Sequence, residues 1–319
     1  MIENGDVCPI CGNDNDNHVF VVKEMMIGLR EDFEYVECSN CGCLFLKDVP
    51  ENMSRYYDSD YGPHQNNNNL KNKMLNKVVG LYLSNNSLIS TIAPKDAVPP
   101  VADLIKGLVA SKAITKKSAV LDVGCGQGNF LNYLKLGGFK DLTGIDLFME
   151  EKNMIYDFKF IQSSLEDFNT SRKFDLILSN HSFEHMPNQL VNMKCLENLV
   201  SDEGLILLRI PVKSKFVWDT FGVNWYQIDA PRHLFLHTVK SLEILCSKTN
   251  LVIEDIIFDS SHLLFTNSQK YCQDIAMRDE NWNSVTFSDD EIKNYKQQVK
   301  KLNEDKNADQ ATFILKLKK

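Results

Sequence analysis

The sequence lacks any long run of apolar residues. No stretch approaches the roughly 20 apolar residues that a membrane-spanning helix requires, and the first residues have neither the basic start nor the apolar centre of a secretion signal. We therefore expect no membrane contact and a cytoplasmic location. Basic residues are also in deficit, because 35 Lys and Arg stand against 43 Asp and Glu and give a formal net charge of -8. This balance disfavours nucleic acid as the main partner.

The sequence shows no internal repeats. At 319 residues, of which 43% are hydrophobic, the chain is long enough to bury one large core and still carry a small accessory module. With nucleic acid and membrane disfavoured, a small-molecule substrate becomes the favoured partner. The oligomeric state does not follow from the sequence.

Cysteine is plentiful, with nine residues in the chain. Four of them form two Cys-x-x-Cys-Gly motifs, at Cys8, Cys11, Cys38 and Cys41. The glycine lets each motif turn back on itself, and four thiolates suit one tetrahedral zinc ion. We predict a zinc ribbon, with strands at residues 18–23 and 33–37 between its two motifs; the alternative is a set of unligated thiols. A zinc ion with four thiolates has no open position, so its role is structural or recognition.

Residues 118–128, Ser-Ala-Val-Leu-Asp-Val-Gly-Cys-Gly-Gln-Gly, form an apolar strand that runs into a glycine loop. Because glycine has no Cβ and adopts positive φ at little cost, the loop amides at Gly124, Gly126 and Gly128 can approach a polar ligand closely. Asp146 ends a second strand twenty residues after Gly126 and is placed to accept hydrogen bonds from a ribose. The pattern predicts a nucleoside-containing cofactor.

The glycine loop lacks the third small residue of a dinucleotide-binding fingerprint. That fingerprint requires glycine or alanine at residue 129, where the helix packs on the strand, and the chain has Asn129. NAD is therefore disfavoured as the cofactor.

Two further segments follow in order, Phe-Asp-Leu-Ile-Leu-Ser-Asn-His-Ser-Phe-Glu-His-Met-Pro (174–187) and Gly-Leu-Ile-Leu-Leu-Arg-Ile-Pro (204–211). With the glycine loop they resemble the first, fourth and fifth strand motifs of class I S-adenosylmethionine (SAM) methyltransferases. The resemblance implies an α/β fold with a doubly wound, seven-stranded Rossmann-like sheet. It also implies a SAM site at Asp122, Gly124, Gly126, Gly128, Asp146, Leu147, Ser164, Leu165 and Asn180. Asp122 is equally well explained as a carboxylate that organises the loop.

Strands and helices alternate after residue 118, as a mostly parallel sheet requires. The expected strands are 119–123, 141–146, 158–162, 174–179, 204–210 and 251–259, and the expected helices are 128–136, 188–200 and 238–248. In the resembling family the last strand, here 312–318, pairs beside the sixth. We predict a zinc-ribbon module at 1–61, a helical linker at 62–117 and a SAM domain at 118–319 with an insertion at 262–310.

His181-Ser-Phe-Glu184-His185 has the spacing of a zinc-protease motif. That motif requires a continuous helix, whereas these residues directly follow a strand and Pro187 interrupts any helix. We therefore interpret Asn180 and His181 as lying at the carboxyl end of the fourth strand, next to the transferred methyl group.

The segment Asp229-Ala-Pro-Arg-His233 follows the fifth strand. It resembles a loop of sugar C-methyltransferases, which also carry a cysteine-rich zinc module, although Arg232 replaces a glutamate there. Histidine accepts protons near neutral pH, and arginine can bind phosphate or carboxylate. We predict His233 as the general base, with His181 in reserve; the alternative is a structural histidine. By this resemblance the acceptor is a small polar metabolite, and a nucleotide-linked sugar is favoured.

Two other functions remain open. An RNA methyltransferase could use the ribbon to read nucleic acid, but neither cysteine motif is surrounded by Lys or Arg. A noncatalytic protein could retain the same fold to sense SAM or to act as a scaffold, but such a protein would not need His181 and His233.

Overall fold

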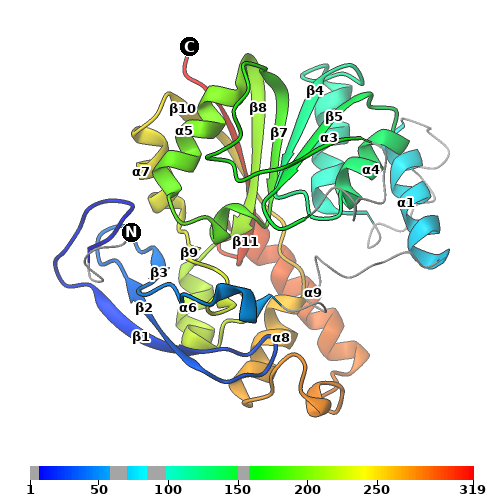
Figure 1. Ribbon diagram of the computed structural model, residues 1–319. Coiled ribbons are helices and arrows are strands. Elements are labelled where there is room, and N and C mark those ends of the chain that lie inside the picture. Colours follow the sequence, from blue (N-terminus) through cyan, green and yellow to red (C-terminus); the bar gives the residue numbers. More distant parts are fainter. Residues whose placement is uncertain (1–6, 58–69, 85–97, 150–157) are drawn as a thin grey trace. The chain divides into compact units, whose positions relative to one another are not determined.

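The computed structural model describes residues 7–57, 70–84, 98–149 and 158–319 (Figure 1). The chain divides into two compact units. Unit 1 comprises residues 1–58, 181–193 and 209–313, and unit 2 comprises residues 59–180, 194–208 and 314–319. The predicted boundary between residues 61 and 62 lies outside the described residues. The predicted division into three segments therefore stays a prediction.

The larger sheet has seven strands in the order β10-β11-β8-β7-β4-β5-β6 (Figure 1). Its strands are β4 (Ala119–Val123), β5 (Asp141–Asp146), β6 (Lys159–Gln162), β7 (Phe174–Asn180), β8 (Val200–Pro211), β10 (Leu251–Phe258) and β11 (Gln310–Leu317). β4 pairs in parallel with β5 and with β7, and β5 pairs in parallel with β6. The predicted Rossmann-like methyltransferase sheet is confirmed, and the last strand lies beside β10 as expected.

Unit 2 contains the apolar core around the parallel strands. Val120 and Leu121 of β4 are fully buried, as expected for parallel strands that are covered on both faces. The core also includes residues of α1 (Leu70–Leu83), α3 (Pro100–Ala110) and α4 (Asn129–Leu136). A Cβ on Gly80 would lie 2.3 Å from the Cβ of Leu136, so glycine is required for α1 to pack this closely on α4. Residues 62–69 and 85–97 of the predicted helical linker lie outside the described residues.

The smaller sheet belongs to unit 1 and has the order β1-β2-β3-β9. Its strands are β1 (His18–Lys23), β2 (Asp32–Glu37), β3 (Leu44–Leu46) and β9 (Phe235–Leu236). The predicted hairpin is confirmed, since β1 and β2 pair antiparallel in full register. β9 comes from a segment about 190 residues further along the chain and pairs with β3, so the ribbon sheet is completed by a distant part of unit 1.

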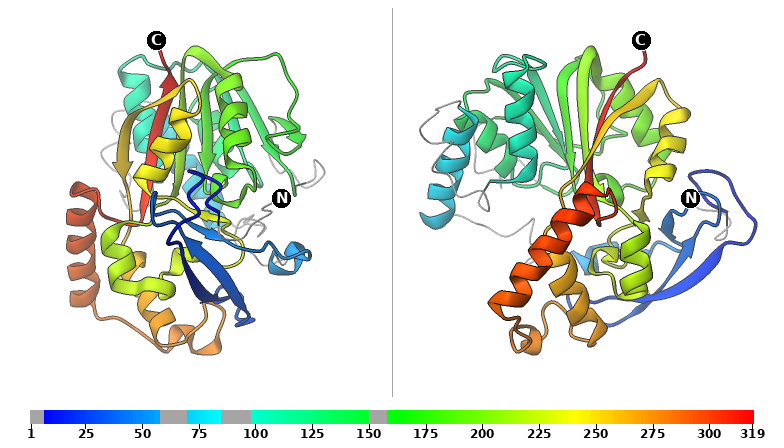
Figure 2. Two further views of the ribbon diagram at one scale, coloured as in Figure 1. Left: turned by 90° about the vertical axis from the view of Figure 1, so that its left-hand side faces the viewer. Right: turned by 180° about the vertical axis from the view of Figure 1, so that it is seen from behind.

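The remaining helices are α5 (Gln189–Leu199), α6 (Lys215–Phe221), α7 (Val239–Ser247), α8 (Leu263–Cys272) and α9 (Asp289–Glu304). α7 and α9 start with capping boxes, Thr238 with Ser241 and Ser288 with Glu291, which satisfy the first free amides of each helix. α8 and α9 form most of the predicted insertion and lie side by side (Figure 2), where the rings of Phe265 and Tyr295 stack at 5.0 Å. None of the helices in the described part of the chain is long and apolar enough to cross a membrane.

Candidate functional site

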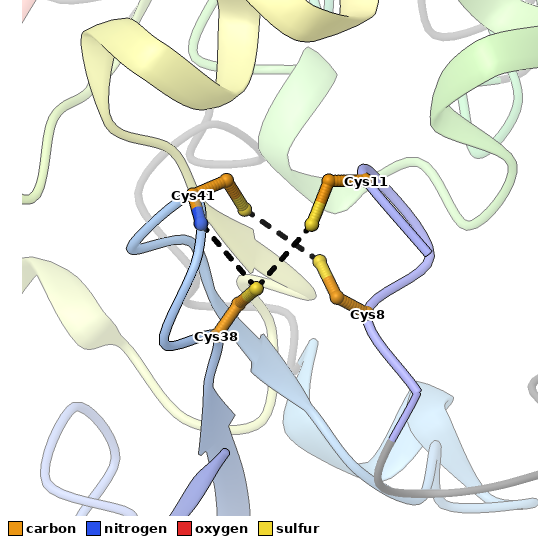
Figure 3. A group of neighbouring side chains, drawn as sticks. All are labelled: Cys8, Cys11, Cys38 and Cys41. Carbon is orange, nitrogen blue, oxygen red and sulfur yellow. Dashed lines mark hydrogen bonds between the residues drawn. The ribbon is translucent and has the colours of Figure 1, made fainter. Parts of the chain in front are cut away.

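The four predicted zinc ligands lie together in unit 1, and their sulfur atoms point toward one another (Figure 3). The Sγ atoms of Cys8 and Cys41 are 3.6 Å apart, and those of Cys11 and Cys38 are 3.4 Å apart. These separations are far longer than a disulfide bond of about 2.0 Å. They are close to the ~3.8 Å that separates sulfurs in a tetrahedral zinc site with Zn–S bonds of about 2.3 Å. The donor set and its geometry therefore fit one zinc ion.

Each cysteine motif is a tight turn closed by glycine. Gly12 and Gly42 have φ of 78° and 72°, and each amide donates to the carbonyl of the first cysteine of its motif. This left-handed conformation is the reason that glycine follows each pair. The turns are anchored on α7, because the Thr238 hydroxyl donates to the Cys41 carbonyl and Lys248 donates to the Ile10 carbonyl.

The glycine loop at the end of β4 has the conformation predicted from its composition. Gly124, Gly126 and Gly128 all have positive φ, at 71°, 51° and 76°. The Gly126 amide donates to Asp146 Oδ2 at 2.9 Å, so the loop is tied to the end of β5. Gly144 makes this approach possible, because a Cβ there would lie 2.7 Å from Cys125 Sγ.

Asp146 organises two segments at once. Besides the Gly126 amide, its carboxylate accepts hydrogen bonds from the amides of Phe148 and Met149. A carboxylate offers about four lone-pair positions, and three are used here. One position remains for a ribose hydroxyl, so Asp146 can bind a ligand while it holds the loop.

Asp122 is buried next to Asp146. Burial, and then the negative charge of Asp146, raise the pKa of Asp122 to about 8. The carboxyl group is therefore largely protonated at neutral pH. A cationic ligand near this carboxyl would favour its ionised form.

The other residues predicted to bind the cofactor are Leu147, Ser164, Leu165 and Asn180, and they differ in burial and in hydrogen bonding. The Ser164 hydroxyl donates to Asp167 Oδ2 and accepts from the Asp167 amide, so it closes a local turn. Leu165 is buried, whereas Leu147 is 51% exposed. Asn180 is the last residue of β7 and is half-buried. The assignment of these residues to SAM stays a prediction.

A cluster of polar side chains forms in unit 1 directly after β7. His181 has a φ of 52° and begins the segment that forms a short 3-10 helix over Phe183–His185. A zinc-protease motif requires a continuous helix, and this single turn does not provide one. The structure thus agrees with the sequence analysis, which argued against that motif. Arg209 lies 2.7 Å from His181 Nε2 and must be the donor, because a guanidinium group has no acceptor atom. The hydrogen of His181 is therefore on Nδ1, which donates to Glu184 Oε1 at 3.2 Å. Both ring nitrogens of His181 are thus hydrogen-bonded.

Glu184 is fully buried at the centre of this cluster. Burial alone would raise its pKa, but the hydrogen bond from His181, the largest opposing cause, lowers the pKa of Glu184 to about 2. The carboxylate is therefore ionised. Its Oε2 atom is buried and has no hydrogen-bond partner among the described residues.

His233 and His185 pack against each other, with ring centroids 4.6 Å apart. His233 Nδ1 donates to the Gln227 carbonyl at 2.8 Å, which leaves Nε2 as the lone-pair nitrogen, 3.9 Å from Glu184 Oε1 and 3.8 Å from Asp229 Oδ2. Burial and the neighbouring His233 lower the pKa of His185 to about 4, so this ring is neutral.

Arg232 does not have the exposed position that binding of a substrate phosphate requires. Its guanidinium is fully buried and donates to Asp229, Glu24 and the Tyr56 carbonyl. The Glu24 carboxylate in turn accepts from the amides of Met26, Ile27 and Leu29. A buried charge requires a compensating partner, and Arg232 finds one in Glu24, directly after β1. The arginine therefore links the β1–β2 hairpin to the segment 229–233.

The sequence did not indicate several members of the cluster. Tyr57 lies with its hydroxyl 3.1 Å from His185 Nδ1, Arg209 pairs with Asp259, and Glu24 pairs with Arg232. A single charged residue in an otherwise apolar segment, as at Arg209, was the only available signal. Trp225 is 1% exposed and donates to Asp309. It belongs to the core.

The chain matches a family described as a methyltransferase domain over residues 97–256, just over half of its length. The chain therefore belongs to the methyltransferase domain family. The predicted enzyme class, a methyltransferase, is confirmed by this match.

Two solved structures illustrate what the chain is similar to. One is described as a putative sarcosine dimethylglycine methyltransferase from Galdieria sulphuraria, with 14% identity, coverage of 66% of this chain and 83% of that chain, and a TM-score of 0.45. The other is a SAM-dependent methyltransferase from Clostridium acetobutylicum, with 12% identity, coverage of 68% and 90%, and a TM-score of 0.43. No curated protein matches the chain.

Proposed function

We propose that the chain is a SAM-dependent methyltransferase that acts on a small polar acceptor. The observation that carries the proposal is the glycine loop of unit 2, with three positive-φ glycines after β4 and a bond from Gly126 to Asp146 at the end of β5. Parallel α/β sheets bind their ligands at the carboxyl ends of strands, where this loop lies. The family match supports the same reaction class.

SAM supplies a methyl group on a cationic sulfonium, and the chain aligns the acceptor and takes its proton where needed. In the proposal, the loop 124–128 holds the amino acid part of SAM and Asp146 holds the ribose. His233 takes the acceptor's proton, because its Nε2 is the lone-pair nitrogen while both nitrogens of His181 are hydrogen-bonded.

The nucleotide-linked sugar suggested by the sequence resemblance remains the favoured acceptor class. Its phosphates would need another cationic group, since Arg232 is occupied by Glu24 and Asp229. We also propose that Cys8, Cys11, Cys38 and Cys41 bind one structural zinc ion. The cluster geometry supports this proposal.

The direct test is calorimetric titration of the full chain with SAM and with its demethylated product. We expect one binding site per chain, and Asp146→Ala should weaken binding by about 1 to 3 kcal/mol, the scale of a lost hydrogen bond to a charged group. Asp141→Ala is the matched control, since it removes an acid from the other end of β5. Absence of SAM binding by the folded wild-type chain would refute the proposed function, and unchanged affinity of Asp146→Ala would refute the ribose assignment alone.

A further inference from the structure

Three donor groups of unit 1 converge in a place that the proposed zinc ribbon does not use. One donor atom from each of Glu184, His185 and His233 lies within 4.8 Å of the others. Within the described residues, the only other such group of metal-ligating side chains is the four-cysteine cluster. The donors are two imidazoles and one carboxylate.

Both imidazoles are held in the tautomer that a metal ligand needs. His185 Nδ1 lies 2.8 Å from the Arg232 carbonyl, and His233 Nδ1 lies 2.8 Å from the Gln227 carbonyl. Because a carbonyl only accepts, each Nδ1 carries a hydrogen, and in the neutral form of each ring Nε2 is the nitrogen with the lone pair. Metal-ligating histidines show this arrangement, in which the second nitrogen donates to a backbone carbonyl or carboxylate.

The carboxylate has an oxygen that no protein group uses. Glu184 is 0% exposed, and its Oε1 accepts from His181 while Oε2 has no partner among the described residues. An unpartnered buried carboxylate oxygen is costly, because its hydration has been removed without replacement. A cation bound by this carboxylate, whose Oε1 lies 3.9 Å from His233 Nε2, would reduce that cost.

We propose that Glu184, His185 and His233 bind one divalent transition-metal ion of the zinc or iron(II) type. Two neutral imidazoles with one carboxylate are the donor set that these ions prefer, and the same three ligands leave positions open. Magnesium prefers oxygen ligands and is disfavoured by the two nitrogens. Bonds of about 2.1 Å require the donors to approach one another by about 1 Å.

The role of this ion rests on the proposed function, although its binding does not. The ion would coordinate the acceptor's hydroxyl and lower its pKa, so that the hydroxyl would give its proton to solvent water more readily before the methyl group is transferred to the oxygen. In the ion-bound chain His233 Nε2 is a ligand, and the ion takes over the activation that His233 provides in the ion-free chain. Loss of turnover in a His233 variant fits both roles and does not decide between them.

The test measures metal binding by the full chain after one equivalent of zinc per chain has been added, which the four thiolates of the cysteine cluster take up. Cobalt(II) is then titrated while heat and visible absorbance are recorded. We expect one cobalt ion per chain, with ligand-field absorbance and without the thiolate charge-transfer bands that displacement of the cysteine-bound zinc would produce. Glu184→Gln and His185→Gln should each weaken binding at least about 100-fold. His18→Gln, a change in an exposed histidine of β1, is the matched control and should bind as the wild type does.

The outcomes separate the two proposals. If the wild-type chain takes up no second ion, or if Glu184→Gln and His185→Gln bind cobalt as tightly as the wild type, the metal site is refuted. Each variant is first checked for SAM binding and for its thermal transition, so a misfolded variant is recognised and the wild-type titration still decides. SAM binding without cobalt binding refutes this inference alone, whereas cobalt binding without SAM binding refutes the proposed function alone.

Discussion

Arg232 and His233 are neighbours in the sequence but differ in the interactions that their side chains make. The arginine is a fully buried cation that is compensated by Glu24 and Asp229, whereas the histidine keeps one ring nitrogen with a lone pair. The sequence predicted both residues as candidates for substrate chemistry. It could not show which nitrogen of His233 is hydrogen-bonded, because Gln227 acts through its backbone carbonyl, which every residue has.

Asp122 predicts an unusual pH dependence of stability. Its pKa is about 8 in the folded chain and near 3.8 when unfolded, so between these values the folded chain holds a proton that the unfolded chain has lost. Its contribution to the free energy of unfolding is therefore greatest at low pH and falls by up to about 1.4 kcal/mol for each pH unit from about 4 to 8. Asp122→Asn cannot ionise, so its stability relative to the wild type should rise across this range.

Urea unfolding of both proteins at pH 5, 6, 7 and 8 measures this difference. Parallel pH curves for the wild type and Asp122→Asn would show that the carboxyl is ionised in the folded chain, and the assignment of a raised pKa would then be wrong.

His233→Ala tests the proposed proton acceptor. We expect SAM affinity to stay within the error of the wild type, because the proposal gives His233 no contact with the cofactor and the Nδ1 of its ring bonds to the Gln227 carbonyl. Turnover should fall about 10² to 10⁴-fold, the usual contribution of a general base. The rate is measured with methyl-labelled SAM on an acceptor that the wild type methylates in a panel of hydroxylated and amine-bearing metabolites. Full turnover in the variant would remove His233 from the mechanism, and loss of SAM binding would mark it as structural.

At the scale of elements, the most predictable parts are those defined by short spacings. The β4 strand, its glycine loop and Asp146 lie where the sequence placed them, because a strand, a turn and the next strand are set by neighbouring residues. The ends of β8 were less predictable. It begins at Val200 instead of residue 204, because strand pairing extends through polar residues that have no local β signal.

The prediction of a zinc site also belongs to the scale of elements, because it depends on two short cysteine motifs. Elemental analysis of the chain purified without added metal should show zinc, and Cys11→Ser should lower the zinc content by one equivalent per chain, because a thiolate ligand is lost. Cys272→Ser changes an exposed cysteine outside the cluster and should leave the content unchanged. A wild-type content near zero, or iron in place of zinc, would contradict the proposal.

At the scale of the whole molecule, the ribbon depends on residues far from it in the sequence. β3 pairs with β9, Tyr35 donates to the His233 carbonyl, and buried Glu24 pairs with Arg232. A fragment of residues 1–57 therefore loses a strand partner and exposes a buried carboxylate. We expect this fragment to lack a cooperative thermal transition even with zinc bound.

Circular dichroism of the zinc-loaded fragment, recorded beside the full chain over the same temperatures, measures this dependence. A sharp transition of the fragment near that of the full chain would show that the ribbon folds independently, as the predicted module boundary at residue 61 implies.

The sequence by itself determined the reaction class, the seven-stranded sheet, the glycine loop and the clustering of the four cysteines. Each of these depends on residues a few positions apart or on the alternation of apolar runs, and such patterns are visible in one dimension. Only the tertiary structure decided that Arg232 is compensated by Glu24, 208 residues away, that β9 completes the ribbon sheet, and that Glu184 keeps a buried oxygen without a partner among the residues that the structure describes. These features arise from packing between distant segments, because burial decides which charges need partners and which ring nitrogens remain available.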